Sequence, residues 1–301
     1  MSLRVANLAQ HNFTLNRALD TQSRLQDLQA QIATGRKSLT YAGISADASQ
    51  LVSLEGQLTR MQQYQEGNIL VDQRLSRMDA AISTIFDSML ALRSLLQQEL
   101  NAPSTGNVPL ADEAQNHLDT VVSQLNLKVN GRVLFAGSKT TTQPVQTPPP
   151  DPSVFGVPEA NYYDGDAVEL TARIAEDREV RYGVTADRLA FQEAIGALQA
   201  AIEGDNTDDP VLVDAALGLT VNAIDALPEI RSEIGAVQLS IAGQNKRHED
   251  FLVFTENVVS NIENVDVPSA VLRLASEETL LEASYLTLVR VGNLTLADFL
   301  R

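Results

Sequence analysis

Residues 8–32 read LAQHNFTLNRALDTQSRLQDLQAQI, and the spacing of their apolar side chains decides the fold. Apolar residues return about every 3.5 positions, which is the repeat of a helix that buries one narrow stripe against another helix. Residues 267–288, near the C-terminus, show the same repeat. The predicted seam residues are Leu8, Leu15, Ala18, Leu25 and Ile32 in the first stretch and Val267, Val271, Leu274, Leu281, Tyr285 and Leu288 in the second. The pattern predicts helical arms that pair with each other or with neighbouring copies.

Long helices are predicted between the arms as well. The first proline is Pro103, and residues 46–100 keep helical spacing, so they predict a rod roughly 80 Å long at 1.5 Å per residue. Residues 103–106 form a turn signal, after which a helix is expected from Leu110 to about Lys128. Helical spacing returns over residues 189–202 and 211–262, with a kink or division expected at Pro228.

A proline-rich segment interrupts the helices in the middle of the chain. Six of the eleven prolines fall between Pro144 and Pro158, which neither a helix nor a central strand tolerates. Apolar residues then alternate from Val168 to Tyr182, which predicts a small β-hairpin. We expect residues 140–184 to be a surface-exposed β insert with a small core of its own.

These patterns predict a mainly α fold. It consists of long antiparallel helical rods with coiled-coil-like terminal arms and a small inserted β domain. The predicted domains are the arms (residues 1–45 with 262–301), the rod (46–139 with 185–261) and the insert (140–184).

The amino-acid composition excludes several classes of site and partner. The chain has no Cys, so disulfides and thiolate metal sites are excluded. Its net charge of -17 disfavours nucleic acid or an anionic membrane as a partner. No apolar run is expected to cross a bilayer, and the first residues lack the apolar core of a signal peptide. We therefore expect no membrane insertion, and either a cytoplasmic protein or one exported without a cleaved signal.

Catalytic signals are missing from the sequence. The three histidines, His11, His117 and His248, are far apart, and no phosphate-binding loop or metalloprotease motif occurs. Residues 205–209 read DNTDD, which favours a solvated acidic turn over a calcium site because the glycine and distal Glu of an EF-hand are not in place. We predict no catalytic residue, no cofactor and no metal, and hence no enzyme.

Several passages, in order along the chain, resemble the bacterial flagellin superfamily. They are QIATGRK at residues 31–37, SEIGAVQ at 232–238 and SNIENVD at 260–266. Two further passages are similar to the hook-associated junction branch of that superfamily: NGRVLFAGSKT at 130–140 and LTLADFL at 294–300. The turn at Asp164–Asp166 and its following strands resemble the small β domain of the same branch.

The resemblance implies a structural subunit of the bacterial flagellum that joins a hook-side adaptor to the filament and self-assembles through paired terminal helices. It further implies an extracellular location reached through the flagellar secretion channel, a cytoplasmic export chaperone, and a ring of copies between the hook-side adaptor protein and flagellin filament subunits. Two alternatives remain open, namely a filament flagellin and a cytoplasmic coiled-coil scaffold.

Overall fold

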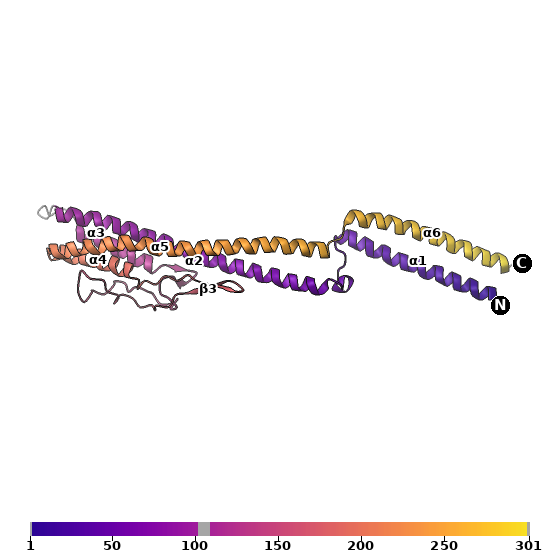
Figure 1. Cartoon of the computed structure of the whole chain (residues 1–301), viewed down its shortest axis with the longest axis horizontal. Helices are drawn as coiled ribbons and strands as arrows, with labels where there is room; N and C mark the ends of the chain where they lie inside the picture. The colour runs from indigo at the N-terminus through magenta and orange to yellow at the C-terminus, as the bar shows by residue number, and fades with distance from the viewer. Residues whose placement is uncertain (1, 102–108, 300–301) are drawn as a thin grey trace. The chain divides into compact units, whose positions relative to one another are not determined.

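Helices dominate the computed structural model, which describes residues 2–101 and 109–299 (Figure 1). The two β-hairpins in this described part are short, so the predicted mainly α fold class is confirmed. The turn predicted at residues 103–106 lies outside the described residues, as does Leu300. The elements are α1 (Ser2–Thr34), the 3-10 helix η1 (Tyr41–Ile44), α2 (Ala48–Asn101), α3 (Leu110–Leu125), β1 (Lys128–Val129), β2 (Arg132–Val133), β3 (Thr171–Ala175), β4 (Arg178–Arg181), α4 (Leu189–Asn206), α5 (Pro210–Glu263) and α6 (Val267–Phe299).

The chain divides into two compact units. One comprises residues 1–59 and 251–301 and contains α1 and α6, and the other comprises residues 60–250. The second unit contains α3, α4, both hairpins and most of α2 and α5. It therefore holds the main hydrophobic core of the protein.

Within the second unit, α2 and α5 run antiparallel and are joined by polar side chains. Asn68 donates to Asn245, Gln238 donates to Asp72, and Arg231 donates to Asp79 at 2.8 Å, so the residue number rises on α2 as it falls on α5. The apolar face of α2 has the three- and four-residue spacing of a buried helix stripe. Its fully buried members are Leu75, Met78, Ile82, Ile85, Met89, Leu92 and Leu96.

Helix α5 runs unbroken through Pro228, so the predicted division at this residue is wrong. The proline ring is exposed, whereas Leu227 and Ile230 on either side of it are buried in the core. A proline inside a helix costs about 3 kcal/mol, and burying two such side chains stabilises by about 1.5–3 kcal/mol each. Packing therefore outweighs the lost hydrogen bond.

One stretch of α5 is also long and apolar enough, by length and composition, to cross a bilayer. This differs from the prediction that no apolar run of the sequence could cross a bilayer. Its apolar residues supply core side chains to the helix bundle, among them Val213, Ala216, Leu219 and Ala223. Packing in the core accounts for the buried side chains of this stretch.

The first hairpin is built around its turn. Asn130 and Gly131 have φ angles of 52° and 77°, the left-handed conformation that a two-residue hairpin turn needs, and they join β1 to β2. The second hairpin joins β3 to β4, with a register irregularity between Arg173 and Ala175. Both the hairpin and its turn at residues 176–177 agree with the sequence pattern.

The prediction that the insert has a core of its own is wrong. Four of its buried side chains, Val145, Tyr162, Ile174 and Tyr182, belong to the same hydrophobic cluster as the helices. The Tyr162 hydroxyl donates to the Ala186 carbonyl oxygen at 2.8 Å, just before α4. Strands of two to five residues bury too little surface to be stable alone, so the insert packs on the helices.

Because of Tyr162, the stability of this unit should fall at alkaline pH. Burial raises the pKa of its phenol well above the ordinary value near 10, with Asp187 and Tyr163 adding to the effect. Because the unfolded chain ionises first, the free energy of unfolding should fall as pH rises above about 10, by up to about 1.4 kcal/mol per pH unit for this group. Urea unfolding at pH 8, 10 and 11 should show a shallower fall for Tyr162→Phe than for the wild type. Parallel falls would contradict this assignment.

Candidate assembly interface

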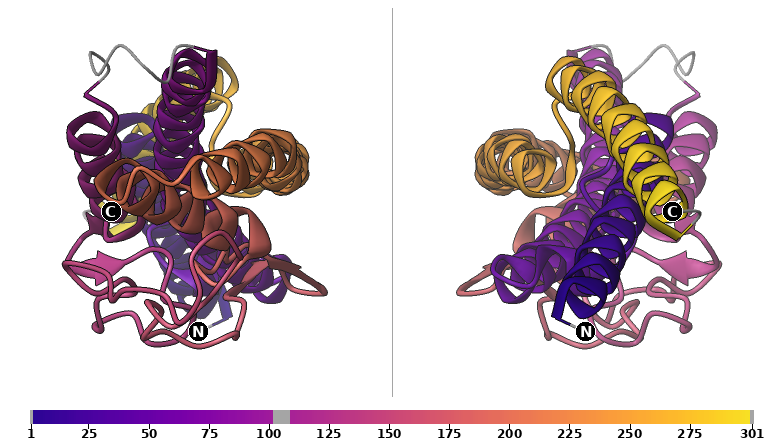
Figure 2. Two further views of the ribbon diagram at one scale, coloured as in Figure 1. Left: turned by 90° about the vertical axis from the view of Figure 1, so that its left-hand side faces the viewer. Right: turned by 90° about the vertical axis from the view of Figure 1, so that its right-hand side faces the viewer.

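The terminal arms α1 and α6 lie side by side and run antiparallel, as Figures 1 and 2 show. Backbone hydrogen bonds fasten them where the two helices meet the rest of their unit. The Lys37 amide donates to the Glu263 carbonyl oxygen at 2.7 Å, and the Val265 amide donates to the Gly35 carbonyl oxygen at 2.9 Å. Gly35 ends α1 with a φ of 71°, a left-handed conformation that favours glycine. The two arms thus have a defined common base.

The contact between the arms is a regular coiled-coil seam. On each helix the less exposed residues follow alternating steps of four and three, which is the heptad spacing of buried a and d positions. We call these residues the arm seam: Thr14, Ala18, Thr21, Leu25, Leu28 and Ile32 on α1, and Ala270, Leu274, Glu277, Leu281, Ser284 and Leu288 on α6. Because both series have the same spacing, they align in six antiparallel layers, from Thr14 with Leu288 to Ile32 with Ala270.

The predicted seam residues differ in how far their side chains are buried. Those on the arm seam are Ala18, Leu25, Ile32, Leu274, Leu281 and Leu288. Those with more exposed side chains are Leu15, Val267, Val271 and Tyr285. The side chain of Leu8 lies outside the described residues. The part that any of them plays in assembly stays a prediction.

Apolar character alone could not locate the arm seam, because half of its positions carry small or polar side chains. Thr21 is buried, and Glu277 and Ser284 occupy interior positions of α6. The Nε atom of Arg24 lies 3.4 Å from Oε1 of Glu277, and the Arg24 guanidinium also donates to the Thr21 hydroxyl at 3.0 Å. Strict heptad spacing, continued through Thr21 and Leu28, is the signal that would have found these positions.

A second set of apolar side chains on the arms remains exposed. Leu272 is the extreme case, with 74% of its surface accessible. The larger exposed members are Phe13 and Leu19 on α1 and Val271, Leu272, Leu280, Tyr285, Leu286 and Val289 on α6. We call these eight residues the outer apolar set. So many large exposed apolar side chains on two helices are typical of a surface that contacts another protein.

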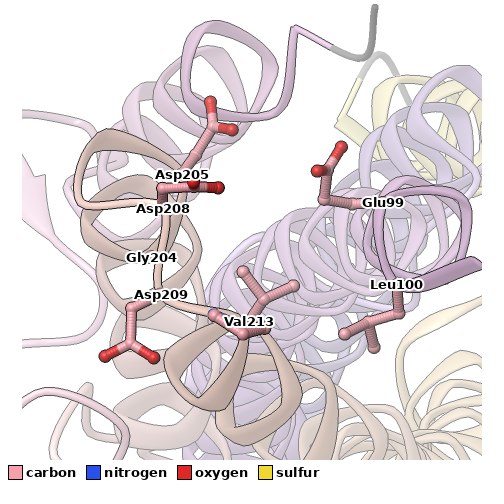
Figure 3. A pocket seen from close by; sticks show the side chains of 8 residues that line it. Glu99, Leu100, Gly204, Asp205, Asp208, Asp209 and Val213 are labelled. Atoms are coloured by element: carbon pink, nitrogen blue, oxygen red, sulfur yellow. The ribbon is translucent and has the colours of Figure 1, made fainter. Parts of the chain in front are cut away.

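A pocket of about 300 Å³ lies in the other unit, between the end of α2 and the loop that joins α4 to α5 (Figure 3). Glu99, Asp205, Asp208 and Asp209 line it. Asp205 accepts a hydrogen bond from the Ala111 amide at the start of α3, and Asp209 accepts one from the Val211 amide at the start of α5. Carboxylates in these positions cap helices. Among the described residues no group of three or more His, Asp or Glu could hold a metal.

A buried polar cluster ties β3 to the rod helices. The Asn68 side chain donates to the Ile174 carbonyl oxygen at 3.2 Å, and Nε2 of His248 lies 2.8 Å from the same oxygen. A carbonyl oxygen only accepts, so this contact is a hydrogen bond in the tautomer that carries the proton on Nε2. The His248 ring also stacks on Tyr64, with ring centroids 5.8 Å apart. His248 therefore has a packing role. His117 lies on α3, and the side chain of His11 is outside the described residues.

Asn68→Ala should therefore destabilise the protein by about 1–3 kcal/mol, since it removes the hydrogen bonds that this buried side chain donates. Its side chain also donates to Oδ1 of Asn245 at 2.7 Å. The matched control is Asn116→Ala on the exposed face of α3, which should change the free energy of unfolding by less than about 0.5 kcal/mol. Urea unfolding of both variants checks this, and equal midpoints would refute the proposed role of the cluster.

Comparison with known proteins agrees with this architecture. The N-terminal helical region of bacterial flagellin matches residues 5–140, and the C-terminal helical region of bacterial flagellin matches residues 217–300. Flagellar hook-associated protein 3 of Salmonella typhimurium is 20% identical over 323 residues, with 98% of each chain covered. The protein of the same name from Escherichia coli is 20% identical over 307 residues, covering 92% of this chain and 93% of that one.

Solved structures share the fold. FlgL from Bacillus cereus has a TM-score of 0.59 and 18% identity, covering 69% of this chain and 99% of that chain. The flagellar junction protein FlgL from Legionella pneumophila has a TM-score of 0.53 and 13% identity, covering 71% of this chain and 99% of that chain. Nearly all of each solved chain is matched, while more than a quarter of this chain has no counterpart in either.

Proposed function

Because this chain belongs to the bacterial flagellin family, we propose that it is a structural subunit of the flagellum and joins the hook side to the filament. The observation that carries the proposal is the pair of antiparallel terminal arms, which keep large apolar side chains exposed outside their mutual contact. The residues of the arm seam pack against each other within one chain. The outer apolar set stays exposed, so neighbouring subunits can pack against it. Such a subunit can be held in a polymer through its ends.

The proposed partners follow from this arrangement. Copies of the chain pack side by side in a ring through the outer apolar set, between a hook-side adaptor protein and flagellin filament subunits. The junction position, as opposed to a place along the filament, is supported by full-length similarity to hook-associated protein 3 of two species. It is also supported by the fold shared with a protein described as the flagellar junction protein.

Export fits the same proposal. The chain leaves through the flagellar secretion channel as an unfolded polypeptide, without a cleaved signal, and a cytoplasmic chaperone covers its arms before export. The absence of Cys over the whole sequence suits this route, because no disulfide can form and hinder export of the unfolded chain. A structural role also accounts for the lack of catalytic motifs.

The decisive experiment is localisation together with complementation. In the source bacterium with its own copy of this gene deleted, the epitope-tagged protein should restore motility, and immunogold labelling should mark a short band between hook and filament. Label along the whole filament would favour the alternative, a filament flagellin. Label confined to the cytoplasm would favour a coiled-coil scaffold and overturn the proposal.

A further inference from the structure

A small cavity lies where the first hairpin meets α2. It has a volume of about 140 Å³, and its lining residues all belong to the unit of residues 60–250. Its apolar wall includes Met78 of α2, Val133 of β2 and Leu134 directly after β2, which are all buried. A cavity needs only about 15 Å³ to hold a water molecule, so this one has room for a small polar group together with water.

The polar groups around this cavity offer hydrogen bonds that no described residue accepts. Nη1 of Arg74 donates to the hydroxyl of the buried Tyr182 at 2.8 Å. An arginine has no acceptor atom, so the Tyr182 proton cannot be donated back to it, and the described part of the chain gives that proton no other acceptor. The Arg132 guanidinium also lines the cavity and has no hydrogen-bond or ion-pair partner among residues 2–101 and 109–299.

A carboxylate of this chain does not supply the missing acceptor. The described residues that line the cavity include no Asp or Glu. Asp166 contacts one lining residue, Ser138, whose amide and hydroxyl both donate to it, and it also accepts from the Val168 amide. Both oxygens of Asp166 are thus already hydrogen-bonded. Two guanidinium groups and a phenol proton around one cavity therefore favour an acceptor from outside the chain.

We propose that this cavity binds a small oxyanion, held by Arg74, Arg132 and the Tyr182 hydroxyl. A guanidinium matches two oxygens of a carboxylate or phosphate with parallel hydrogen bonds, and such charge-assisted bonds are among the strongest in proteins. The apolar wall strengthens them further, because it lowers the local dielectric constant. The bound anion joins three elements, since its ligands come from α2, from β2 and from the residue after β4.

Two sources can supply this oxyanion. One is inorganic phosphate in solution, and the other is the side-chain carboxylate of a neighbouring subunit. The second source rests on the proposed function, in which copies of this chain, each with 39 Asp and Glu residues, pack side by side. Binding of a free anion by the single chain does not rest on it, so this site and the proposed function can fail separately.

NMR of the full-length, nitrogen-15-labelled protein tests the site through its arginine Nε–H signals. Sodium phosphate and sodium acetate are titrated separately against sodium chloride at matched ionic strength, with acetate standing for a side-chain carboxylate. The Arg74 and Arg132 signals should shift saturably with at least one of the two, with a dissociation constant of about 1 mM, as a few charge-assisted hydrogen bonds support. Tighter binding of phosphate assigns the site to inorganic phosphate, whereas acetate binding at least as tightly assigns it to a neighbouring carboxylate.

Arg132→Gln should raise this dissociation constant at least about tenfold, read from the Arg74 signal, because a charge-assisted bond is lost; Arg132 is exposed, so the variant keeps the fold. Tyr182→Phe keeps the ring in the core and should raise the constant about fivefold. The matched control is Arg77→Gln, which removes the same charge from an exposed position of α2 outside the cavity and should change the constant less than about twofold. No saturable shift with either anion, or an equal loss of affinity in the Arg77→Gln variant, would overturn the site.

Discussion

Leu281→Asp should abolish motility while leaving the thermal melting of the purified protein unchanged within about 2 °C. Leu281 is a half-buried member of the arm seam and shares a layer with Thr21. An aspartate there would become buried without a partner only when the arms close, at a cost of several kcal/mol in every subunit. The main core lies in the unit of residues 60–250, which does not contain this side chain.

The measurement pairs complementation of motility with thermal melting. Leu288→Asp, one heptad further along α6, should behave in the same way. Leu281→Met keeps the apolar volume and should retain motility, since such exchanges cost less than about 1.5 kcal/mol. Normal motility of both aspartate variants would show that assembly does not depend on the arm seam. A large drop in melting temperature would mean that the arms are firmly docked in the free chain, which favours a cytoplasmic scaffold.

The sequence was sufficient to predict the helices, because each has a long periodic stripe. The predicted rod at residues 46–100 corresponds to α2 at Ala48–Asn101, and the small β-hairpin predicted between Val168 and Tyr182 corresponds to β3 and β4. Predictions from local sequence were wrong where tertiary packing determines whether a helix continues. Pro228 is a strong helix breaker in isolation, but the core residues on either side of it hold α5 in one piece.

The site was harder to predict than the fold. Hydrophobic spacing includes Leu25 and Leu274, which lie where the arms meet, but it gives no reason to include Thr21 or Glu277. It also assigns Val271 and Tyr285 to the same stripe, although both are exposed in the structure. Buried and exposed apolar residues have overlapping spacings on these helices, and only the position of the partner helix separates them.

The contact between the arms buries little apolar surface. Leu25 is the only large apolar side chain of the arm seam that is buried among the described residues. Isolated helices gain most of their stability from packing, so these arms depend on their neighbours.

Trypsin should therefore cut the isolated full-length protein rapidly at Arg17, Arg24 and Arg273 in the arms. The internal control is Arg77, which is exposed on α2 within the main bundle and should resist because its helix is held by the core. In assembled flagella the arm sites should become resistant by at least tenfold in rate, since neighbouring copies cover the outer apolar set. On this account the arms become stably ordered on assembly, because contacts with neighbouring subunits offset the conformational entropy that the arms lose. If the free protein resists cleavage at Arg17 and Arg273 as well as it does at Arg77, the arms are already stable alone and this account of assembly is wrong.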